Sequence, residues 1–132
     1  MRRMEQLVVG MAGAGGDGIV SAGEVLTYAS AKAGYYAIMT KSFGSQVRGG
    51  ECSCRVRLSA VPLDDAGDAL ELVVSLSWPD FVKFGKELDV AAGGTVVWDV
   101  ACGEPPAALV ATWPEDVERV AAPITELAKK AS

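Results

Sequence analysis

A cluster of glycines near the N-terminus constrains the fold of this chain more than any other feature. The cluster Gly13-Ala14-Gly15-Gly16-Asp17-Gly18 follows the short apolar run Gln6–Met11 and precedes a helical stretch from Ile19 to Ala33. Strand, tight turn and helix in this order open an α/β unit, in which the helix crosses back over the sheet. Tyr35–Met39 is predicted as a second buried strand, so we expect the two strands to form a parallel pair.

Strands and helices alternate along the rest of the chain. The apolar pattern predicts further strands at Glu51–Ser59, Glu71–Leu76, Thr95–Val100 and Val117–Ala122. Two further helices are predicted, one capped by Ser77 and running to about Leu88, the other from Pro123 to Lys130. We expect a turn at Gly93-Gly94 and an irregular stretch at Ala101–Pro114. In the first helix, residues at three- and four-residue steps are predicted to form the apolar face: Ala22, Val25, Leu26, Ala29 and Ala33.

The strand Glu51–Ser59 alternates apolar and polar residues, which predicts burial on one side, at an edge or in antiparallel pairing. We interpret Cys52 and Cys54 as core residues on its apolar face, because two thiols without further ligands make a poor metal site. Three cysteines in the whole chain argue against a disulfide scaffold and for a reducing, cytoplasmic setting. The three tryptophans are interpreted as packing or interface residues: Trp78, Trp98 and Trp113.

The composition excludes several functions. The 132 residues contain no histidine and no asparagine, so we expect no catalytic residue and no metal ligand in this chain. The net charge is −5, although residues 1–63 alone carry +3. A globally acidic chain is a poor nucleic-acid binder, and no apolar run reaches the roughly 18 residues of a transmembrane helix. We therefore expect neither nucleic acid nor a membrane as a partner.

The glycine cluster matches G-x-G-x-x-G at Gly13, Gly15 and Gly18. Glycines let backbone amides approach a phosphate at a helix N-terminus, where unpaired N–H groups favour negative charge. A tight strand–helix turn without a ligand is the alternative. NAD is disfavoured, because its ribose hydroxyl calls for an acidic residue about 20 positions on. No Asp or Glu lies between Glu24 and Glu51, so NADP or another phosphorylated nucleotide stays open.

The segment Lys41–Gly50 is predicted as a loop that combines cations, hydroxyls and a Gly-Gly pair. These are the ingredients of a phosphate-binding nest, and an ordinary solvated loop is the alternative. Arg55 and Arg57 share one strand face and would extend a basic surface from it. Asp17 is placed to cap the first helix.

Two segments resemble a known family. The stretch from Gly13 to Leu26, followed by Ser42-Phe43-Gly44-Ser45-Gln46-Val47-Arg48-Gly49-Gly50, is similar to the gamma subunit or domain of 2-oxoacid:ferredoxin (acceptor) oxidoreductases. The family pattern is a glycine turn, then an aromatic-glycine element and R-G-G. The segments Asp68–Leu76 and Pro123–Ala128 are similar as well, so the resemblance covers nearly the whole chain.

The resemblance implies a three-layer α/β/α sandwich with a mostly parallel sheet. It implies a subunit that helps to hold coenzyme A while a 2-oxoacid of the pyruvate or 2-oxoglutarate class is oxidatively decarboxylated to acyl-CoA. Thiamine diphosphate, Mg²⁺ and 4Fe–4S clusters would lie in partner alpha and beta subunits, with a delta or ferredoxin-like subunit in some complexes, and ferredoxin would accept the electrons. The residues carried over to coenzyme A binding are Gly13, Gly15, Gly16, Asp17, Gly18, Ser45, Gln46, Arg48, Gly49 and Gly50.

The resemblance also bears on the extent of the domain. Residues 1–132 are expected to form a single gamma-type domain that is short for the family at its C-terminus, where gamma domains usually continue with a further helix. Two other functions stay open at this point. One is a stand-alone Rossmann-like module that binds NADP or another phosphorylated nucleotide, and the other is a purely structural assembly domain.

Overall fold

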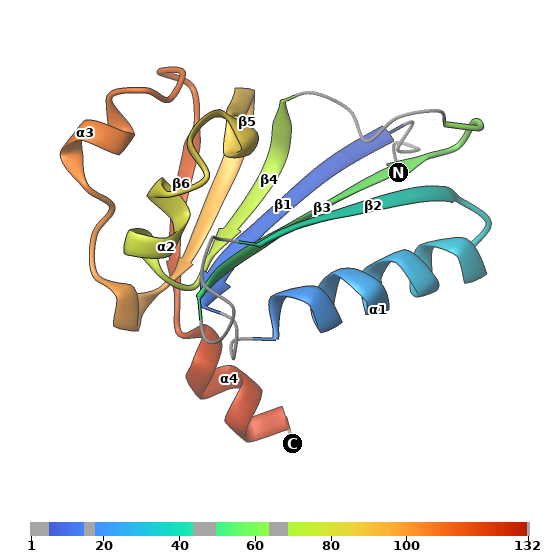
Figure 1. Cartoon of the computed structure of the whole chain (residues 1–132), viewed down its shortest axis with the longest axis horizontal. Helices are drawn as coiled ribbons and strands as arrows, with labels where there is room; N and C mark the ends of the chain where they lie inside the picture. The colour runs from blue at the N-terminus through green and yellow to red at the C-terminus, as the bar shows by residue number, and fades with distance from the viewer. Residues whose placement is uncertain (1–5, 15–17, 44–49, 64–68, 132) are drawn as a thin grey trace.

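The computed structural model describes residues 6–14, 18–43, 50–63 and 69–131, and these ranges contain a six-stranded sheet with helices on both faces (Figure 1). The strand order is β2-β3-β1-β4-β5-β6. The strands are β1 (Gln6–Ala14), β2 (Tyr36–Phe43), β3 (Glu51–Ser59), β4 (Leu70–Ser75), β5 (Val90–Asp99) and β6 (Glu118–Ala122). The helical elements are α1 (Ile19–Lys32), α2 (Trp78–Val82), η1 (Gly85–Leu88), η2 (Val100–Cys102), α3 (Ala107–Val110) and α4 (Ile124–Ala131).

The sheet is mostly parallel, as predicted, because β4 pairs in parallel with both β1 and β5, and β5 pairs in parallel with β6. The expected parallel pair of β1 and β2 is corrected. These strands run in the same direction, but β3 lies between them and is antiparallel to both. The antiparallel pairing of β3 is confirmed, but its position is interior, and Ser53 and Ser59 on its polar face are buried as well. Hydropathy alternation reports which face of a strand is buried and not which strands flank it.

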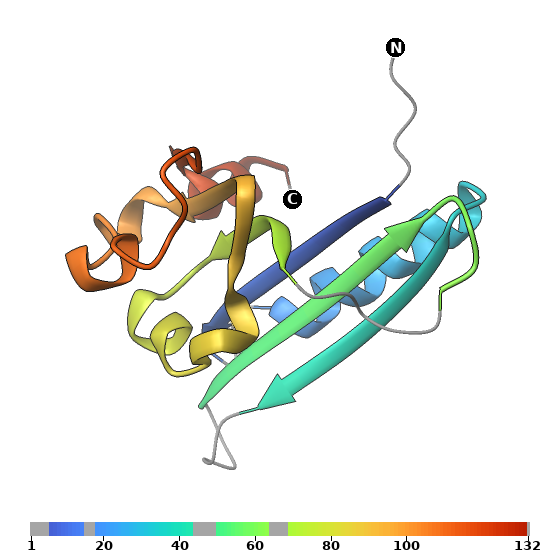
Figure 2. The ribbon, with the colours of Figure 1, turned by 90° about the horizontal axis from the view of Figure 1, so that it is seen from above.

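Helices lie on both faces of the sheet. Helix α1 runs along β1, β2 and β3 on one face (Figures 1 and 2). Helix α2 lies on the other face, where it also contacts β1 and β3, and Leu109 of α3 packs against the same core as α2. Each face has its own core, one with Ile19 from α1 against Val9 and Met11, the other with Phe81 from α2 against Val73 and Val96. This is the three-layer α/β/α arrangement expected for the chain.

The buried face of α1 differs from the prediction. Its buried residues are Ile19, Gly23 and Ser30, with Leu26 half-buried between them. The predicted apolar residues that are exposed are Ala22, Val25, Ala29 and Ala33, the last of which is the C-cap of the helix. The helix packs through small residues because it lies close to the sheet. A β-carbon on Gly23 would lie 2.7 Å from Sγ of Cys54 and 2.8 Å from Cε of Met39. Glycine and serine are not counted as apolar residues, so hydropathy alone assigns the wrong face of α1 to the core.

Several element boundaries also differ. The helix predicted to reach Leu88 ends at Val82 and continues as the separate turn η1, whose first residue Gly85 has φ +52°. The Gly93-Gly94 pair lies inside β5 and is not a turn between elements. The stretch Ala101–Pro114 contains α3. The cap at Ser77 is confirmed, since its Oγ accepts a hydrogen bond from the Asp80 amide at 3.3 Å.

The packing role predicted for the tryptophans is confirmed by an aromatic cluster centred on Trp78. Its ring lies 5.5 Å from Phe81, 5.6 Å from Trp98 and 6.3 Å from Trp113 between centroids. The indole Nε1–H donates to the carbonyl of Gly103 at 2.9 Å, so the one polar atom of this buried ring is satisfied. The cluster joins α2 to β5 and to the segment that follows α3.

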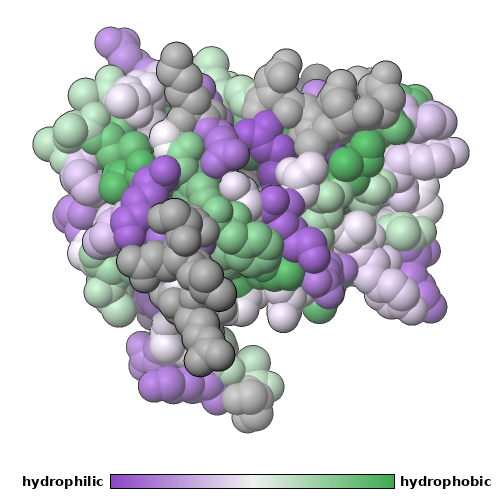
Figure 3. Space-filling view, viewed as in Figure 1, coloured by the Kyte–Doolittle hydropathy of each residue, from purple (hydrophilic) through white to green (hydrophobic). Residues whose placement is uncertain are grey.

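Helix α4 stands away from the body of the molecule (Figures 1 and 3). The carboxylate of Asp99, at the end of β5, holds its first turn. One carboxylate oxygen accepts from both the backbone amide (3.2 Å) and the hydroxyl of Thr125, and the other accepts from the amide of Ala101 at 3.2 Å. These hydrogen bonds, the Thr125 hydroxyl first, lower the pKa of Asp99 below its usual value.

The lowered pKa predicts a pH dependence of stability. A carboxyl whose pKa is lower in the folded state stabilises above its unfolded pKa of about 4, and this contribution is lost as the pH falls through the folded pKa. The difference in unfolding free energy between the natural chain and Asp99→Asn should be constant from pH 7 to 5 and shrink below about pH 4. Urea titrations across this range measure it, with Asp116→Asn at an exposed carboxyl as control. A difference that did not change with pH would contradict the assignment.

Candidate functional site

The strands that adjoin the two segments predicted from sequence to form the site are paired in one ladder. Strands β1 and β3 are paired so that Gly13 lies opposite Cys52 and Ala14 lies opposite Glu51. The end of β1, which leads into the glycine turn, is therefore a direct neighbour of the start of β3, which follows the Arg-Gly-Gly loop. The carboxyl ends of β1 and β4 share this edge of the sheet, where open α/β sheets bind their ligands.

The predicted site residues are described only in part. Gly13 lies within β1 and not in the turn itself, Gly18 is the N-cap of α1 with φ +78°, and Gly50 directly precedes β3. A left-handed φ at the N-cap suits glycine, which carries no β-carbon. The other predicted residues lie outside the described ranges: Gly15, Gly16, Asp17, Ser45, Gln46, Arg48 and Gly49.

Two cysteine thiols flank the glycine turn. Cys52 donates to the carbonyl of Ala14 at 3.7 Å, just before the turn, and Cys54 donates to the carbonyl of Ile19 at 3.5 Å, just after it. Both side chains are buried, so the prediction that they are core residues is confirmed. Burial, with a smaller effect of neighbouring Cys52, raises the pKa of Cys54 to about 11, so this thiol keeps the proton that it donates.

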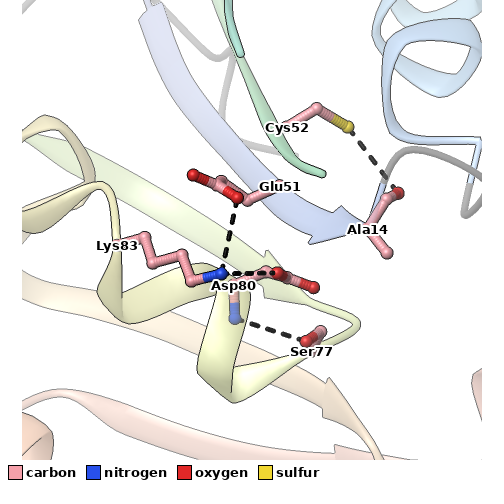
Figure 4. A network of polar contacts seen from close by, with 6 residues as sticks. All are labelled: Ala14, Glu51, Cys52, Ser77, Asp80 and Lys83. Carbon is pink, nitrogen blue, oxygen red and sulfur yellow. Dashed lines mark hydrogen bonds and ion pairs between the residues drawn. The ribbon is translucent and has the colours of Figure 1, made fainter. Parts of the chain in front are cut away.

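Charged residues that the sequence did not single out gather at the same edge (Figure 4). The ammonium of Lys83 lies 3.5 Å from the Glu51 carboxylate and 3.8 Å from that of Asp80. The Glu51 side chain is 11% exposed and that of Lys83 is 53% exposed. This contact joins α2 to the start of β3. Nothing in the sequence connects Lys83 to Glu51, which lies 32 residues away.

The basic residues around the predicted loop are each held by a neighbour. Lys41 lies in β2, not in a loop, and its ammonium is 3.8 Å from the carboxylate of Glu24. Arg57 donates to the side-chain oxygen of Gln6 at 2.8 Å. Arg55 donates to the backbone carbonyl of Glu87 in η1. The three cations therefore contact three different neighbours.

The described strands and helices form an α/β domain in which the end of β1 and the start of β3 lie side by side at one edge of the sheet. Residues 8–132 match the family described as pyruvate ferredoxin/flavodoxin oxidoreductase, and the chain belongs to this family.

Curated relatives agree with this assignment. The chain is 34% identical over 92 residues to ketoisovalerate oxidoreductase subunit VorA of Methanothermobacter thermautotrophicus, covering 69% of this chain and 19% of that protein. It is 34% identical over 91 residues to 2-oxoglutarate synthase subunit KorC of Methanothermobacter marburgensis, covering 67% of this chain and 48% of that one. The chain thus spans about a fifth of the first relative and about half of the second.

Two solved structures of similar fold align with nearly all of this chain. The 2-oxoglutarate:ferredoxin oxidoreductase of Magnetococcus marinus, with 2-oxoglutarate, coenzyme A and succinyl-CoA bound, has a TM-score of 0.79 and 27% identity over 97% of this chain and 22% of that chain. The gamma subunit of a keto/oxoacid ferredoxin oxidoreductase from Geobacter sulfurreducens has a TM-score of 0.72 and 25% identity, over 97% of this chain and 66% of that one. No helix in the described residues is long and apolar enough to cross a membrane.

Proposed function

We propose that this domain helps to bind coenzyme A in a 2-oxoacid:ferredoxin oxidoreductase. The observation that carries the proposal is the register of β1 and β3, which sets Gly13 and Ala14 directly beside Glu51 and Cys52. The strand end that leads into the glycine cluster and the strand start that follows the Arg-Gly-Gly segment thereby lie at one edge, where backbone amides and Arg48 would hold the phosphates. The similar enzyme from Magnetococcus marinus, solved with coenzyme A bound, supports this choice of ligand.

The reaction would be completed by partner subunits. In the proposed complex, thiamine diphosphate, Mg²⁺ and 4Fe–4S clusters lie in alpha and beta subunits or in a delta or ferredoxin-like subunit, and ferredoxin accepts the electrons. This division of labour is supported by the absence of histidine and asparagine from the chain. In the described residues no group of three Cys, Asp or Glu side chains is placed to hold a metal ion. None of the three cysteines forms a disulfide, which supports a cytoplasmic location.

Removing the guanidinium of Arg48 is expected to weaken coenzyme A binding. In the assembled complex, Arg48→Ala should raise the apparent KM for coenzyme A by about tenfold, because a charge-assisted hydrogen bond to phosphate contributes roughly 1.5–3 kcal/mol. The KM for the 2-oxoacid should not change, since the residue would not contact that substrate. Steady-state kinetics with each substrate varied in turn measures both values.

The same experiment separates the competing functions. Arg57→Ala, in a residue of the same charge that lies on β3 away from the loop, is the matched control and should leave both KM values unchanged. An unaltered KM for coenzyme A in Arg48→Ala would refute the loop assignment. Calorimetry of the chain with coenzyme A and with NADP distinguishes the proposal from a stand-alone NADP-binding module.

A further inference from the structure

In the described part of the chain, α1 covers only half of the sheet face on which it lies. It runs along β1, β2 and β3 and does not reach β5 or β6 (Figures 1 and 2). The other half of this face carries a row of valines from three adjacent strands, Val74, Val97 and Val120, with Leu72 and Ala122 beside them. All five side chains are half-buried. We refer to these five residues as the open face.

The opposite face of the same strands shows how complete covering changes exposure. Val73 and Val96 are fully buried there, and Trp98 is 4% exposed, in the core that α2 shares with the segment around α3. Parallel strands are usually covered on both faces, because their connections place helices on each side of the sheet. The difference between the two faces of β4 and β5 therefore marks the open face as a surface that a further helix would cover.

Helix α4 has an apolar face that the described part of its own chain does not bury. Its apolar residues recur at three- and four-residue steps: Ile124, Leu127, Ala128 and Ala131. No residue of α4 is buried, and Leu127 is 54% exposed. A helix of eight residues is too short to be stable alone in water, so most of its stability must come from packing of its apolar face.

The connection between β6 and α4 keeps α4 away from its own sheet. Pro123 is the one residue between the end of β6 at Ala122 and the start of α4 at Ile124. Strand-to-helix connections in α/β folds usually have about two to six residues, which let the helix turn back over the sheet. Helix α4 instead continues past the end of β6 and points away from the body (Figure 1). A hinge too short to return an element to its own body favours exchange of that element between two copies.

Helix α4 and the open face match in size and in charge. A helix of eight residues is about 12 Å long. Three strands spaced about 4.8 Å apart form a face about 10 Å across, which such a helix can span. Glu118 lies at the margin of the open face, opposite Thr95, and is exposed. Lys130, in the last turn of α4, carries the complementary charge.

We propose that two copies of this chain form a dimer by exchanging α4, so that the apolar face of each α4 packs on the open face of the other copy. The exchange is reciprocal, so it closes as a two-fold dimer and does not extend into a chain of subunits. In this dimer, Leu127 of one copy packs against the valine row of the other. The proposal goes beyond the proposed function and does not rest on it, because none of these residues belongs to the candidate site.

Sedimentation equilibrium of the full chain tests the proposal. The natural chain should have the mass of a dimer. Leu127→Glu should raise the dissociation constant at least about tenfold, because a carboxylate would enter an apolar interface. Val25→Glu is the matched control, since Val25 of α1 is also exposed and apolar, and this variant should remain a dimer. Insertion of Gly-Ser-Gly after Pro123 lengthens the hinge so that α4 can reach its own open face, and this variant should be a monomer.

Each result supports the exchange or overturns it. A natural chain that remains a monomer at every concentration would overturn it. A dimer that is unchanged by Leu127→Glu, or that Val25→Glu dissociates, would overturn it by assigning the interface to another surface. A dimer that persists after the insertion would show that the copies associate without exchanging α4. Far-ultraviolet circular dichroism verifies that each variant is folded. If Leu127→Glu does not fold, the insertion variant decides the question, because it removes no side chain.

Discussion

Replacing Trp78 with alanine is expected to lower the free energy of unfolding by about 3–5 kcal/mol, the range for truncating a buried aromatic side chain. Trp78 is 3% exposed and is the only described ring in contact with Phe81, Trp98 and Trp113 together. Its removal leaves a cavity among three aromatic rings that cannot collapse without moving α2. Small domains are stable by only about 5–15 kcal/mol, so the variant should unfold at markedly lower urea concentration.

Trp78→Phe is the control for this prediction. It keeps an aromatic ring in the cluster but loses the Nε1–H that the Gly103 carbonyl accepts. The expected cost of the lost hydrogen bond is about 1 kcal/mol, with a further loss from the smaller ring. Urea unfolding followed by far-ultraviolet circular dichroism measures both variants. A cost below about 1 kcal/mol for Trp78→Ala would show that the cluster does not contribute to the core.

The second large effect is expected at Gly23, where any side chain must enter the interface between α1 and the sheet. Gly23→Ala should destabilise by about 1–3 kcal/mol, the usual cost of overpacking, although alanine favours helix. The added β-carbon would lie 2.7 Å from Sγ of Cys54, which is 1% exposed and cannot leave its place freely.

A double variant makes the Gly23 prediction specific. Cys54→Ala removes the sulfur that meets the new methyl group, so Gly23→Ala should cost less in that background than in the natural chain. Ala22→Leu, at the neighbouring exposed position of α1, is the control and should change stability by no more than about 0.5 kcal/mol. If the losses of unfolding free energy caused by Gly23→Ala and Cys54→Ala were additive in the double variant, the close contact would be ruled out.

From the sequence, the strands and helices of this fold could be predicted better than which strands lie beside one another in the sheet. The strand Glu51–Ser59 was predicted with its observed bounds, because residue alternation is a local property. The insertion of β3 between β1 and β2 was not predicted, because pairing partners are set by the whole sheet. The face of α1 was mistaken for a different reason. Close packing against the sheet favours small residues, here Gly23 and Ser30. Neither residue is strongly hydrophobic, so the buried face of α1 does not stand out as an apolar face in the sequence.

The candidate site was predictable to a similar extent. Glycines and an Arg-Gly-Gly loop are contiguous motifs, so both segments could be proposed from the sequence alone, and the structure sets the strand ends that adjoin them side by side. Lys83 and Glu87 could not be found in this way. They reach Glu51 and Ser42 from α2 and η1, and only the packing of those elements on the sheet creates the contacts.

The shared ladder of β1 and β3 has a mechanical consequence. Nine consecutive residue pairs join these strands, from Gln6 opposite Ser59 to Ala14 opposite Glu51, in the interior of the sheet. The strands that lead to the two predicted segments cannot separate without breaking the hydrogen bonds of that ladder. Their relative position is therefore fixed before a ligand binds, and binding costs no conformational entropy for bringing the two strand ends together. Any movement that accompanies ligand binding must therefore leave this ladder intact.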